Sequence, residues 1–364
     1  MSGQDDRWAK RRGRSRTHFS KHPYARRTRR ELAGPRVRPA EDARDRGGGR
    51  KQNAATASET VAILEAGVYT YLRRKNEDGE DSEDSEEITV SIADDLRAAI
   101  TGTQMYTSAE SAELIPKIGE VEKPILPPTD GSTNDDGKTE QSESDGEADE
   151  KITEMEIEVT LETTLSACSA LVKEYPQIAA LNFASARNPG GGFLKGSSAQ
   201  EESLCRSSGL YSCIVNSPMY AHNEAHLNKC LYTHYGIFSP NVPVIRDDDG
   251  KLIEPYKISF ITCPAVNGGE ASKRGVSWST INAAMMARID RILAIAKHNN
   301  TDALVLGAYG CGVFGNDIRD VVKMFKTLLD TKYEGAFKKV RFAVLGSNDF
   351  EVLCKTFGLE PSDD

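Results

Sequence analysis

Apolar and polar positions form regular patterns in two regions of the chain, one long and one short. From Ile152 onward, helix-spaced apolar patterns alternate with strand-like apolar runs, which is typical of an α/β layered fold. Several of these strands lead into glycine-rich loops, and open α/β sheets bind ligands at the carboxyl ends of their strands. We expect strands at residues 178–184, 257–266, 303–306 and 340–345, and helices at residues 164–175 and 277–299, from Asn316 or Asp317, and after Ser347.

The shorter patterned region precedes this core. Its apolar positions predict a helix at residues 54–67 with Ser58 as a possible cap. Strands at residues 68–72 and 88–92 and a second helix at residues 94–102 follow. We therefore divide the ordered part of the chain into an N-terminal portion, residues 54–116, and a core, residues 152–358, with a short C-terminal tail at residues 359–364.

Charge is distributed unevenly along the chain. Residues 1–51 carry 17 lysines and arginines against 6 acidic residues, although the whole chain has a formal charge of −9. We expect a disordered basic tail at residues 1–53 and a disordered acidic insert at residues 117–151, because neither segment can bury enough apolar surface to fold.

Both segments leave a functional and a plain interpretation open. The basic clusters at residues 10–16 and 26–30 could contact nucleic-acid phosphates or direct nuclear import, and a solvated tail without such a role is the alternative. The acidic insert could fold back over a positively charged pocket, or it could be a solvated loop.

The sequence also excludes some classes of protein. No apolar run approaches the roughly 20 residues that span a bilayer, and the first 30 residues lack the apolar core of a secretory signal. The seven cysteines are scattered and form no Cys-x-x-Cys pair, which favours free thiols, mostly in the core, in a reducing compartment. We expect an intracellular protein of the nucleus or cytoplasm, without a membrane partner.

Two glycine-rich loops each follow a predicted strand. The triplet Gly190 to Gly192 lacks Cβ atoms, so its backbone could approach a ligand and turn its N–H groups toward phosphate oxygens, although a tight turn alone would also need glycine. The second loop, Gly307 to Asn316, opens into a helix, and a helix start attracts anions. Neither loop has the lysine of a P-loop or the dinucleotide fingerprint. Together they predict a diphosphate held by backbone amides.

A pair of glutamates, Glu201 and Glu202, follows the triplet at the start of a predicted helix. Adjacent carboxylates cannot point the same way from a helix, so they should perform different tasks. An isolated pair in a first helical turn would be explained by the helix dipole alone. Beside two glycine loops, the pair indicates chemistry on a glycosidic bond.

These motifs can be compared with known families. The runs Asn188-Pro-Gly-Gly-Gly-Phe193, Gln200-Glu-Glu-Ser-Leu-Cys-Arg206 and Gly307-Ala-Tyr-Gly-Cys-Gly-Val-Phe-Gly-Asn316 resemble the signature of microbial-type poly(ADP-ribose) glycohydrolases, and the resemblance extends over residues 53–112 and 152–358. It implies a macrodomain-like three-layer α/β/α sandwich with a mixed central sheet and an N-terminal helical and strand extension. We expect a monomer whose partners are poly(ADP-ribose), ADP-ribose and poly(ADP-ribosyl)ated proteins.

The resemblance also implies roles for particular residues. Glu202 would act first as general acid and then as general base, and Glu201 would bind ribose hydroxyls. Phe314 would pack against the ribose, unless it is only a hydrophobic plug, and Asn182 and Asn188 are candidates for contacts with ribose hydroxyls. The other residues expected to bind substrate are Gln200, Gly190, Gly191, Gly192, Phe193, Gly307, Gly310, Cys311, Gly312, Val313, Gly315 and Asn316.

The implied activity is hydrolysis of ribose–ribose O-glycosidic bonds in poly(ADP-ribose), which releases ADP-ribose and needs no metal or other cofactor. Two alternatives remain open: a reader that binds ADP-ribose without turnover, and a hydrolase that removes single ADP-ribose units from protein or nucleic acid. The sequence does not decide between polymer and single units, because that choice depends on the groove beyond the distal ribose.

One further set of residues has metal-ligating side chains that recur every four positions: His222, His226, Cys230 and His234. On a continuous helix these residues would share one face, but the segment lies between Pro218 and Pro240 and contains helix-disfavouring asparagines. Ligands spread over three turns would also not converge on one ion. We therefore expect no metal site at His222, His226, Cys230 and His234.

Overall fold

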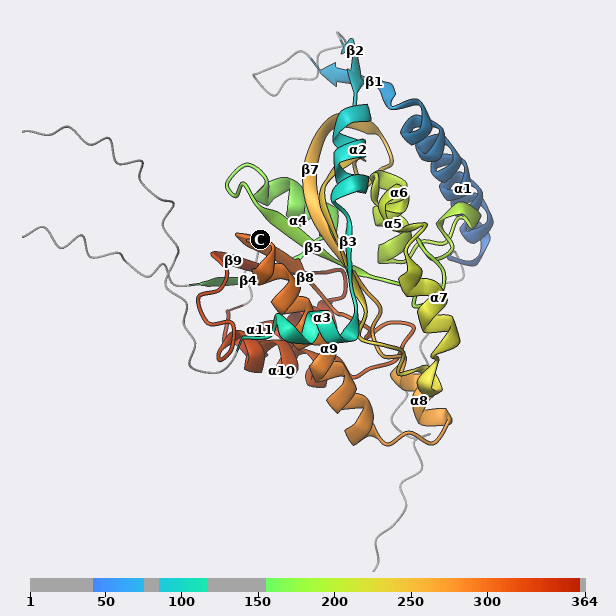
Figure 1. The fold of residues 1–364 in the computed structure, drawn as a ribbon. Helices are drawn as coiled ribbons and strands as arrows, with labels where there is room; N and C mark the ends of the chain where they lie inside the picture. Colours follow the sequence, from blue (N-terminus) through green and yellow to red (C-terminus); the bar gives the residue numbers. More distant parts are fainter. Residues whose placement is uncertain (1–41, 75–84, 117–154, 361–364) are drawn as a thin grey trace, which may run out of the picture. The chain divides into compact units, whose positions relative to one another are not determined.

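The computed structural model describes residues 42–74, 85–116 and 155–360, with only the backbone described for residues 42–48 (Figure 1). The described residues from Gly47 onward form one compact unit, to which the following description applies. The predicted acidic insert, most of the predicted basic tail and most of the C-terminal tail lie outside the described residues. The nucleic-acid contacts and nuclear import considered for the tail therefore remain predictions.

A seven-stranded mixed sheet forms the centre of this unit, in the order β3-β6-β7-β5-β8-β9-β4. The strands from β7 to β4 are parallel, whereas β6 runs antiparallel to both of its neighbours. Because β5 pairs in parallel with both β7 and β8, the loops that follow these three strands lie at one edge of the sheet. The strands are β3 (Gln104–Tyr106), β4 (Glu156–Leu161), β5 (Ile178–Phe183), β6 (Gly236–Arg246), β7 (Leu252–Cys263), β8 (Ala303–Leu306) and β9 (Lys339–Val344).

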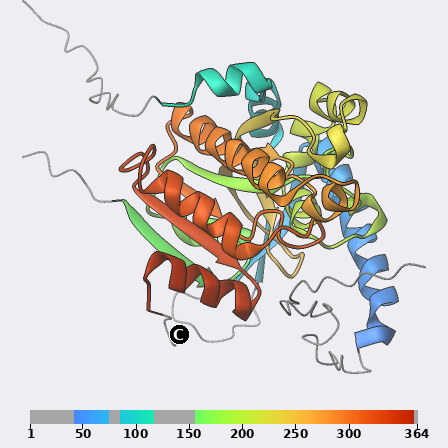
Figure 2. The same cartoon turned by 90° about the horizontal axis from the view of Figure 1, so that it is seen from below.

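Helices cover both faces of the sheet, as the alternation of side chains along β5 shows. Ala179 and Leu181 belong to the apolar core beneath α9 (Trp278–His298), α10 (Ile318–Leu329) and α11 (Ser347–Phe357). Ile178 and Ala180 belong to the core beneath α4 (Thr164–Leu171), α5 (Gln200–Ser207) and α6 (Leu210–Ile214). Figure 2 shows α9 and α10 side by side on one face. The predicted three-layer α/β/α arrangement is confirmed.

The N-terminal portion packs against the end of β6. It consists of α1 (Asp42–Ala66), an antiparallel pair β1 (Val68–Arg74) and β2 (Ser85–Ser91), α2 (Ala93–Gly102) and α3 (Ser108–Glu113). Leu64, Tyr69 and Leu96 form a small core with Ile245 of β6. The predicted extension of helix and strand is therefore present.

Some predicted boundaries are wrong. The first helix begins at Asp42 rather than Ala54, even though Gly47 to Gly49 have low helix propensity. Ser58 is not a cap, because its hydroxyl donates to the carbonyl of Ala54 within the helix, at 3.0 Å. The predicted helix at residues 164–175 already ends at Leu171.

Strand β6 was not predicted, and its prolines explain why. Pro240 and Pro243 argue against a central strand, since proline cannot donate to a ladder. The structure accommodates them with a shift in pairing between Ser239 and Val242, where Asn241 has a φ of 46°. The remaining helical segments are η1 (Phe193–Lys195), α7 (Pro218–Ala225), η2 (Asn228–Cys230) and α8 (Gly268–Lys273).

Two expectations about composition can be compared with the structure. All seven cysteines are free, and every one except Cys311 is buried, as expected for thiols in a core. Among the described residues, no helix has the length and apolar character needed to cross a membrane.

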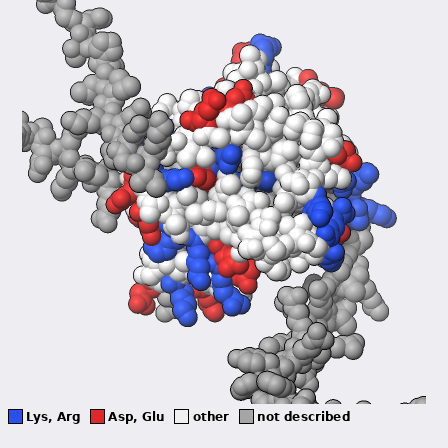
Figure 3. Space-filling model, turned by 60° about the horizontal axis from the view of Figure 1, so that its bottom comes forward, with Lys and Arg blue, Asp and Glu red and all other residues white. Residues whose placement is uncertain are grey.

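On the face shown in Figure 3, lysine and arginine side chains lie mainly along two margins of a broad surface that carries few charges.

Candidate active site

The two glutamates are held by the connection between β5 and α5. Gln200 opens α5, and both ends of its side-chain amide are used within the protein: its Oε1 accepts from the N–H of Phe183 at 2.9 Å, and its Nε2 donates to the carbonyl of Leu181 at 2.8 Å. Nε2 also donates to the hydroxyl of Thr164 at 3.2 Å. Gln200 thus ties the start of the helix to the end of the strand, and its predicted contact with substrate stays a prediction.

Glu201 is buried, with 3% of its surface exposed. One carboxyl oxygen accepts from the N–H of Ser185 at 2.7 Å, and the other faces the Nδ2 of Asn182 at 3.5 Å. Burial raises the pKa of Glu201 to about 8, although the hydrogen bonds from the N–H groups of Ser185 and Gly190 act in the opposite direction. This carboxyl is therefore mostly protonated at neutral pH.

The side chain of Asn182 contacts Glu201 inside the protein and is not part of the cavity wall. Its side chain is 0% exposed and donates to the hydroxyl of Thr262 on β7 at 3.2 Å. In this structure the side chain of Asn182 is thus enclosed by protein, and its predicted contact with a ribose hydroxyl stays a prediction.

Glu202 occupies a different environment from its neighbour. It is partly exposed, and its Oε1 accepts from the N–H of Gly192 at 2.9 Å. Its side chain contributes to the walls of two separate cavities. One carboxyl of the pair is thus enclosed by the protein, and the other stands at the surface of a cavity.

The glycine triplet brings the backbone against these carboxyl groups. A Cβ on Gly191 would collide with Oε1 of Glu202 and lie 3.2 Å from Oε2 of Glu201, and its φ of 58° also favours glycine. The N–H of Gly191 donates to the carbonyl of Asn188 at 2.9 Å, and that of Gly192 donates to Glu202. The triplet therefore serves the carboxylates and its own turn, in place of the phosphate contacts that were predicted.

Phe193 completes this turn as a core residue. Its ring is 1% exposed and packs against Tyr211, with ring centroids 4.7 Å apart, and its N–H donates to the carbonyl of Gly190 at 3.2 Å. Its aromatic face is thus covered by protein rather than presented to a ligand.

The second glycine loop joins β8 to α10, and its backbone N–H groups differ from those of the first loop in their hydrogen bonding. The N–H groups of Gly312, Val313 and Phe314 find no acceptor in the part of the chain that the structure describes. Asp317 caps α10 by accepting from the N–H of Arg319 at 2.9 Å. Three consecutive free donors in front of a helix match the phosphate-binding role predicted for this loop.

Buried contacts fix the shape of the second loop. Asn316 is 7% exposed and donates to the carbonyls of Val266 and Gly310, each at 2.8 Å, so it anchors the loop instead of facing a ligand. Gly310 has a φ of 72°, and a Cβ there would lie 2.6 Å from that of Ala265. Cys311 donates its N–H to the carbonyl of Ala308 at 3.1 Å.

A cavity of about 450 Å³ brings the two loops and both glutamates together. Phe314 and Val313 line it, and Val313 is 93% exposed; the ring of Phe314 packs near Tyr232, with centroids 6.4 Å apart. Gly307 and Gly315 are not part of its wall; a Cβ on Gly307 would lie 2.7 Å from the carbonyl oxygen of Ala343. The further lining residues include Phe183, Ser185, Gly310, Gly312 and Asp349.

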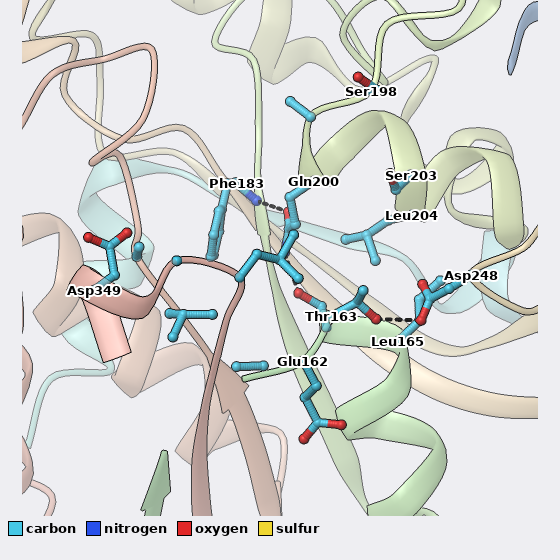
Figure 4. Close-up of a pocket in the computed structure, with 17 residues that line it drawn as sticks. Glu162, Thr163, Leu165, Phe183, Ser198, Gln200, Ser203, Leu204, Asp248 and Asp349 are labelled. Carbon is cyan, nitrogen blue, oxygen red and sulfur yellow. Dashed lines mark hydrogen bonds between the residues drawn. The ribbon is translucent and has the colours of Figure 1, made fainter. Parts of the chain in front are cut away.

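A second cavity, of about 310 Å³, adjoins the first and is shown in Figure 4. The two share Phe183, Gln200 and Asp349, so they form one groove. Leu165 and Leu345 give the second cavity apolar walls. Phe183 and Asp349 were not predicted as site residues, although each stands where a strand ends or a helix begins.

The histidine-rich segment does not form one helical face. Helix α7 ends at Ala225, and His222 stacks on His226 with ring centroids 4.2 Å apart. His234 accepts from the guanidinium of Arg288 at 3.0 Å, and burial together with this cation lowers the pKa of His234 to about 3. The described residues contain no group of three side chains placed to hold a metal ion.

Comparisons with known proteins agree with this geometry. The family model described as the microbial-type PARG catalytic domain matches residues 57–247, more than half of the chain. No curated protein sequence matches. Poly(ADP-ribose) glycohydrolase from Thermomonospora curvata, solved with the inhibitor ADP-HPD, is 36% identical and has a TM-score of 0.66; the match covers 84% of this chain and 100% of that one.

A second solved enzyme gives the same result. Poly(ADP-ribose) glycohydrolase from Deinococcus radiodurans, solved in complex with ADP-ribose, is 34% identical with a TM-score of 0.59, over 71% of this chain and 96% of that one. Both similarities include the mixed seven-stranded sheet and confirm the macrodomain-like fold that the motifs implied. The chain belongs to the family of microbial-type poly(ADP-ribose) glycohydrolases, which are glycosidases.

Proposed function

We propose that this chain hydrolyses the ribose–ribose O-glycosidic bonds of poly(ADP-ribose), including polymer attached to proteins, and releases ADP-ribose. The observation that carries the proposal is the position of Glu202. Its carboxyl group lines the cavity that also contains the three free amides of residues 312–314. A diphosphate bound to those amides would place the distal ribose of an ADP-ribose unit beside Glu202.

Glu202 supplies both proton transfers. Its carboxyl group gives a proton to the departing 2′-oxygen as the bond from that oxygen to C1 of the distal ribose breaks. The resulting carboxylate takes a proton from the water that forms the new bond to C1, and Glu202 returns to its starting state. The N–H of Gly192, 2.9 Å from Oε1, holds the carboxyl group in place throughout.

Glu201 orients the ribose and keeps the local charge low. Because its pKa is about 8, the group carries a proton at neutral pH and can donate a hydrogen bond to a ribose oxygen in the cavity it lines. A neutral Glu201 also avoids placing two negative charges next to the diphosphate. The chain's own residues thus provide binding, orientation and proton transfer.

The groove continues in a way that suits a nucleobase. The cavity in Figure 4 has apolar walls from Leu165 and Leu345, and its rim carries carboxylates of Glu162, Asp248 and Asp349. An aromatic base would bury its faces against the apolar walls, and its amino group would donate to a carboxylate. We place the adenine of the bound unit there.

The direct test compares wild type with Glu202→Gln on labelled polymer. Removing the acid–base group should lower kcat by about 10³-fold, while ADP-ribose affinity measured by calorimetry stays within about threefold. Glu174→Gln, an exposed carboxylate that lines neither cavity of this groove, is the matched control and should retain full activity.

Other outcomes of this test point to other activities. Intact polymer together with tight ADP-ribose binding by the wild type would make the chain a reader. Faster turnover of mono-modified protein than of polymer would make it a mono-ADP-ribosyl hydrolase. Undiminished release by Glu202→Gln would remove the proposed role of this residue.

A further inference from the structure

A third cavity, of about 470 Å³, also has Glu202 in its wall. It shares only Ser185, Gly191 and Glu202 with the central cavity, and no residue of the second glycine loop reaches it. Glu202 therefore belongs to the walls of two cavities that meet at the first glycine loop. If the distal ribose of the bound unit lies in the central cavity, the group bonded to its C1 is directed past Glu202 and into the third cavity.

The walls of the third cavity offer three kinds of contact. Asn188 is exposed, and its side-chain amide has no hydrogen-bond partner among the described residues, although its backbone is held by the hydroxyl of Ser185 at 3.1 Å. Leu194 presents an apolar surface that is 48% exposed. Lys195 follows it on the η1 turn, with its side chain in solvent.

Helix α1 braces the turn that carries Lys195. The Nε of Arg50 donates to the carbonyl of Lys195 at 2.9 Å. The carbonyl of Arg50 lies against Gly196, where a Cβ would collide with it and where φ is 78°. The turn is thus packed between α1 and the catalytic loop, so the position of Lys195 relative to Glu202 is fixed by the fold.

Among the residues that line the third cavity, Lys195 is the cation and Glu202 is the acid, and Arg50 contacts the turn that carries Lys195. In the described ranges, no carboxylate lies within 4 Å of the cationic groups of Lys195 or Arg50. Other exposed cations of the structure, such as Arg187 and Lys257, do pair with carboxylates, at 3.3 Å and 3.0 Å. Lys195, which has no carboxylate partner among the described residues, lies beside an exposed amide and an apolar side chain, and this combination is suited to a phosphorylated sugar.

We propose that the third cavity is a second subsite, which binds the leaving unit of the polymer. Lys195 contacts the 5′-diphosphate of that unit, Asn188 contacts its ribose and Leu194 packs against the sugar or base. The proposal rests on the proposed function, because the leaving oxygen protonated by Glu202 is the 2′-oxygen of this ribose. A unit attached directly to a protein side chain has no such diphosphate, so the subsite makes the enzyme selective for polymer.

Two substrates with the same scissile bond test the subsite. One is the dimer of ADP-ribose, in which the leaving unit carries its 5′-diphosphate. The other is ADP-ribosyl-(1→2′)-adenosine, in which the leaving unit is adenosine without phosphates. Wild type should cleave the dimer with the higher kcat/KM, and this preference should shrink as salt rises, since exposed charges are screened.

The variant Lys195→Gln removes the cation and keeps a polar side chain that is one atom shorter. It should lower kcat/KM for the dimer by about fivefold, the size expected for one exposed ion pair, and leave the adenosine substrate within about 1.5-fold of wild type. ADP-ribose binding should not change, because that product occupies the central cavity. Lys297→Gln, an exposed lysine on α9 that lines none of the three cavities described above, is the matched control and should leave kcat/KM for both substrates unchanged.

Each remaining outcome decides against part of the proposal. Equal losses on both substrates would show that Lys195 supports the catalytic turn and does not bind the leaving unit. No loss on either substrate, with wild-type activity present, would overturn the subsite and leave the proposed function intact. Failure of wild type to cleave either substrate would overturn both.

Discussion

The two glycine loops look alike in the sequence but use their backbones differently. Each follows a parallel strand at the same edge of the sheet, after β5 and after β8. In the first loop, the N–H groups of Gly191 and Gly192 are taken by the carbonyl of Asn188 and the carboxyl of Glu202. In the second, the N–H groups of residues 312–314 have no acceptor in the described chain.

This difference shows what a glycine-rich motif does and does not specify. Glycine permits a close approach of backbone to another group, but it does not determine which group approaches. At the first loop the group is a carboxyl of the protein. At the second we propose that it is an anionic ligand, so that the first loop would serve catalysis and the second would serve binding.

The comparison is tested most strongly by the pH dependence of stability, because the first loop encloses Glu201. Its folded-state pKa of about 8 lies above the ordinary value of 4.5. The folded state thus binds this proton more tightly than the unfolded state does. The contribution of Glu201 is fully present below about pH 4.5 and is lost as the pH rises to about 8, by an amount on the order of 5 kcal/mol.

Urea denaturation of wild type and Glu201→Gln at several pH values measures this effect. The difference in unfolding free energy between the two proteins should change in favour of the variant as the pH rises from 5 to 8, because glutamine cannot lose a proton. Other titrating groups cancel in the comparison. A difference that stays constant across this range would show that the first loop does not hold Glu201 in its neutral form.

The sequence located the elements of the site better than it assigned their tasks. Strand β8 and helix α9 were predicted within one residue at each end, because an apolar run and the cap Ser277 mark them clearly. Strand β6 was missed, since its prolines are tolerated only through a local shift in pairing. Such a shift depends on the neighbouring strand and leaves no pattern in the sequence.

The roles of single site residues show the same limit. The sequence identified Glu201 and Glu202 as a pair with different tasks, and the structure gives them different environments. It could not show that Ser185 holds Glu201, because the contact uses a backbone N–H that every residue except proline has. It also could not show that Asn182 is buried, because the burial of a polar side chain depends on the packing of strands from distant parts of the chain.

A substitution in the first loop should affect the chemical step. In Gly191→Ala, the new methyl group would collide with Oε1 of Glu202 and force an unfavourable φ, so the carboxyl group must move. A displacement of about 1 Å at a catalytic group costs about 10²-fold in rate, and we expect such a loss in kcat. Steady-state kinetics on polymer and calorimetry with ADP-ribose measure the two effects separately. A loss of ADP-ribose affinity as large as the loss in kcat would contradict the division between the loops.

The matching substitution in the second loop should affect binding instead. A Cβ on Gly312 meets no atom of the described chain within 4 Å, so Gly312→Ala should fold as stably as wild type. If a diphosphate lies against the N–H groups of residues 312–314, the methyl group occupies part of its space, and ADP-ribose affinity should fall by about tenfold, or about 1.4 kcal/mol. Since kcat reports the bound complex, it should change by less than about threefold. Thermal denaturation checks the fold, and calorimetry checks the affinity. Unchanged affinity would place the diphosphate elsewhere and leave the free amides of the second loop without their proposed ligand.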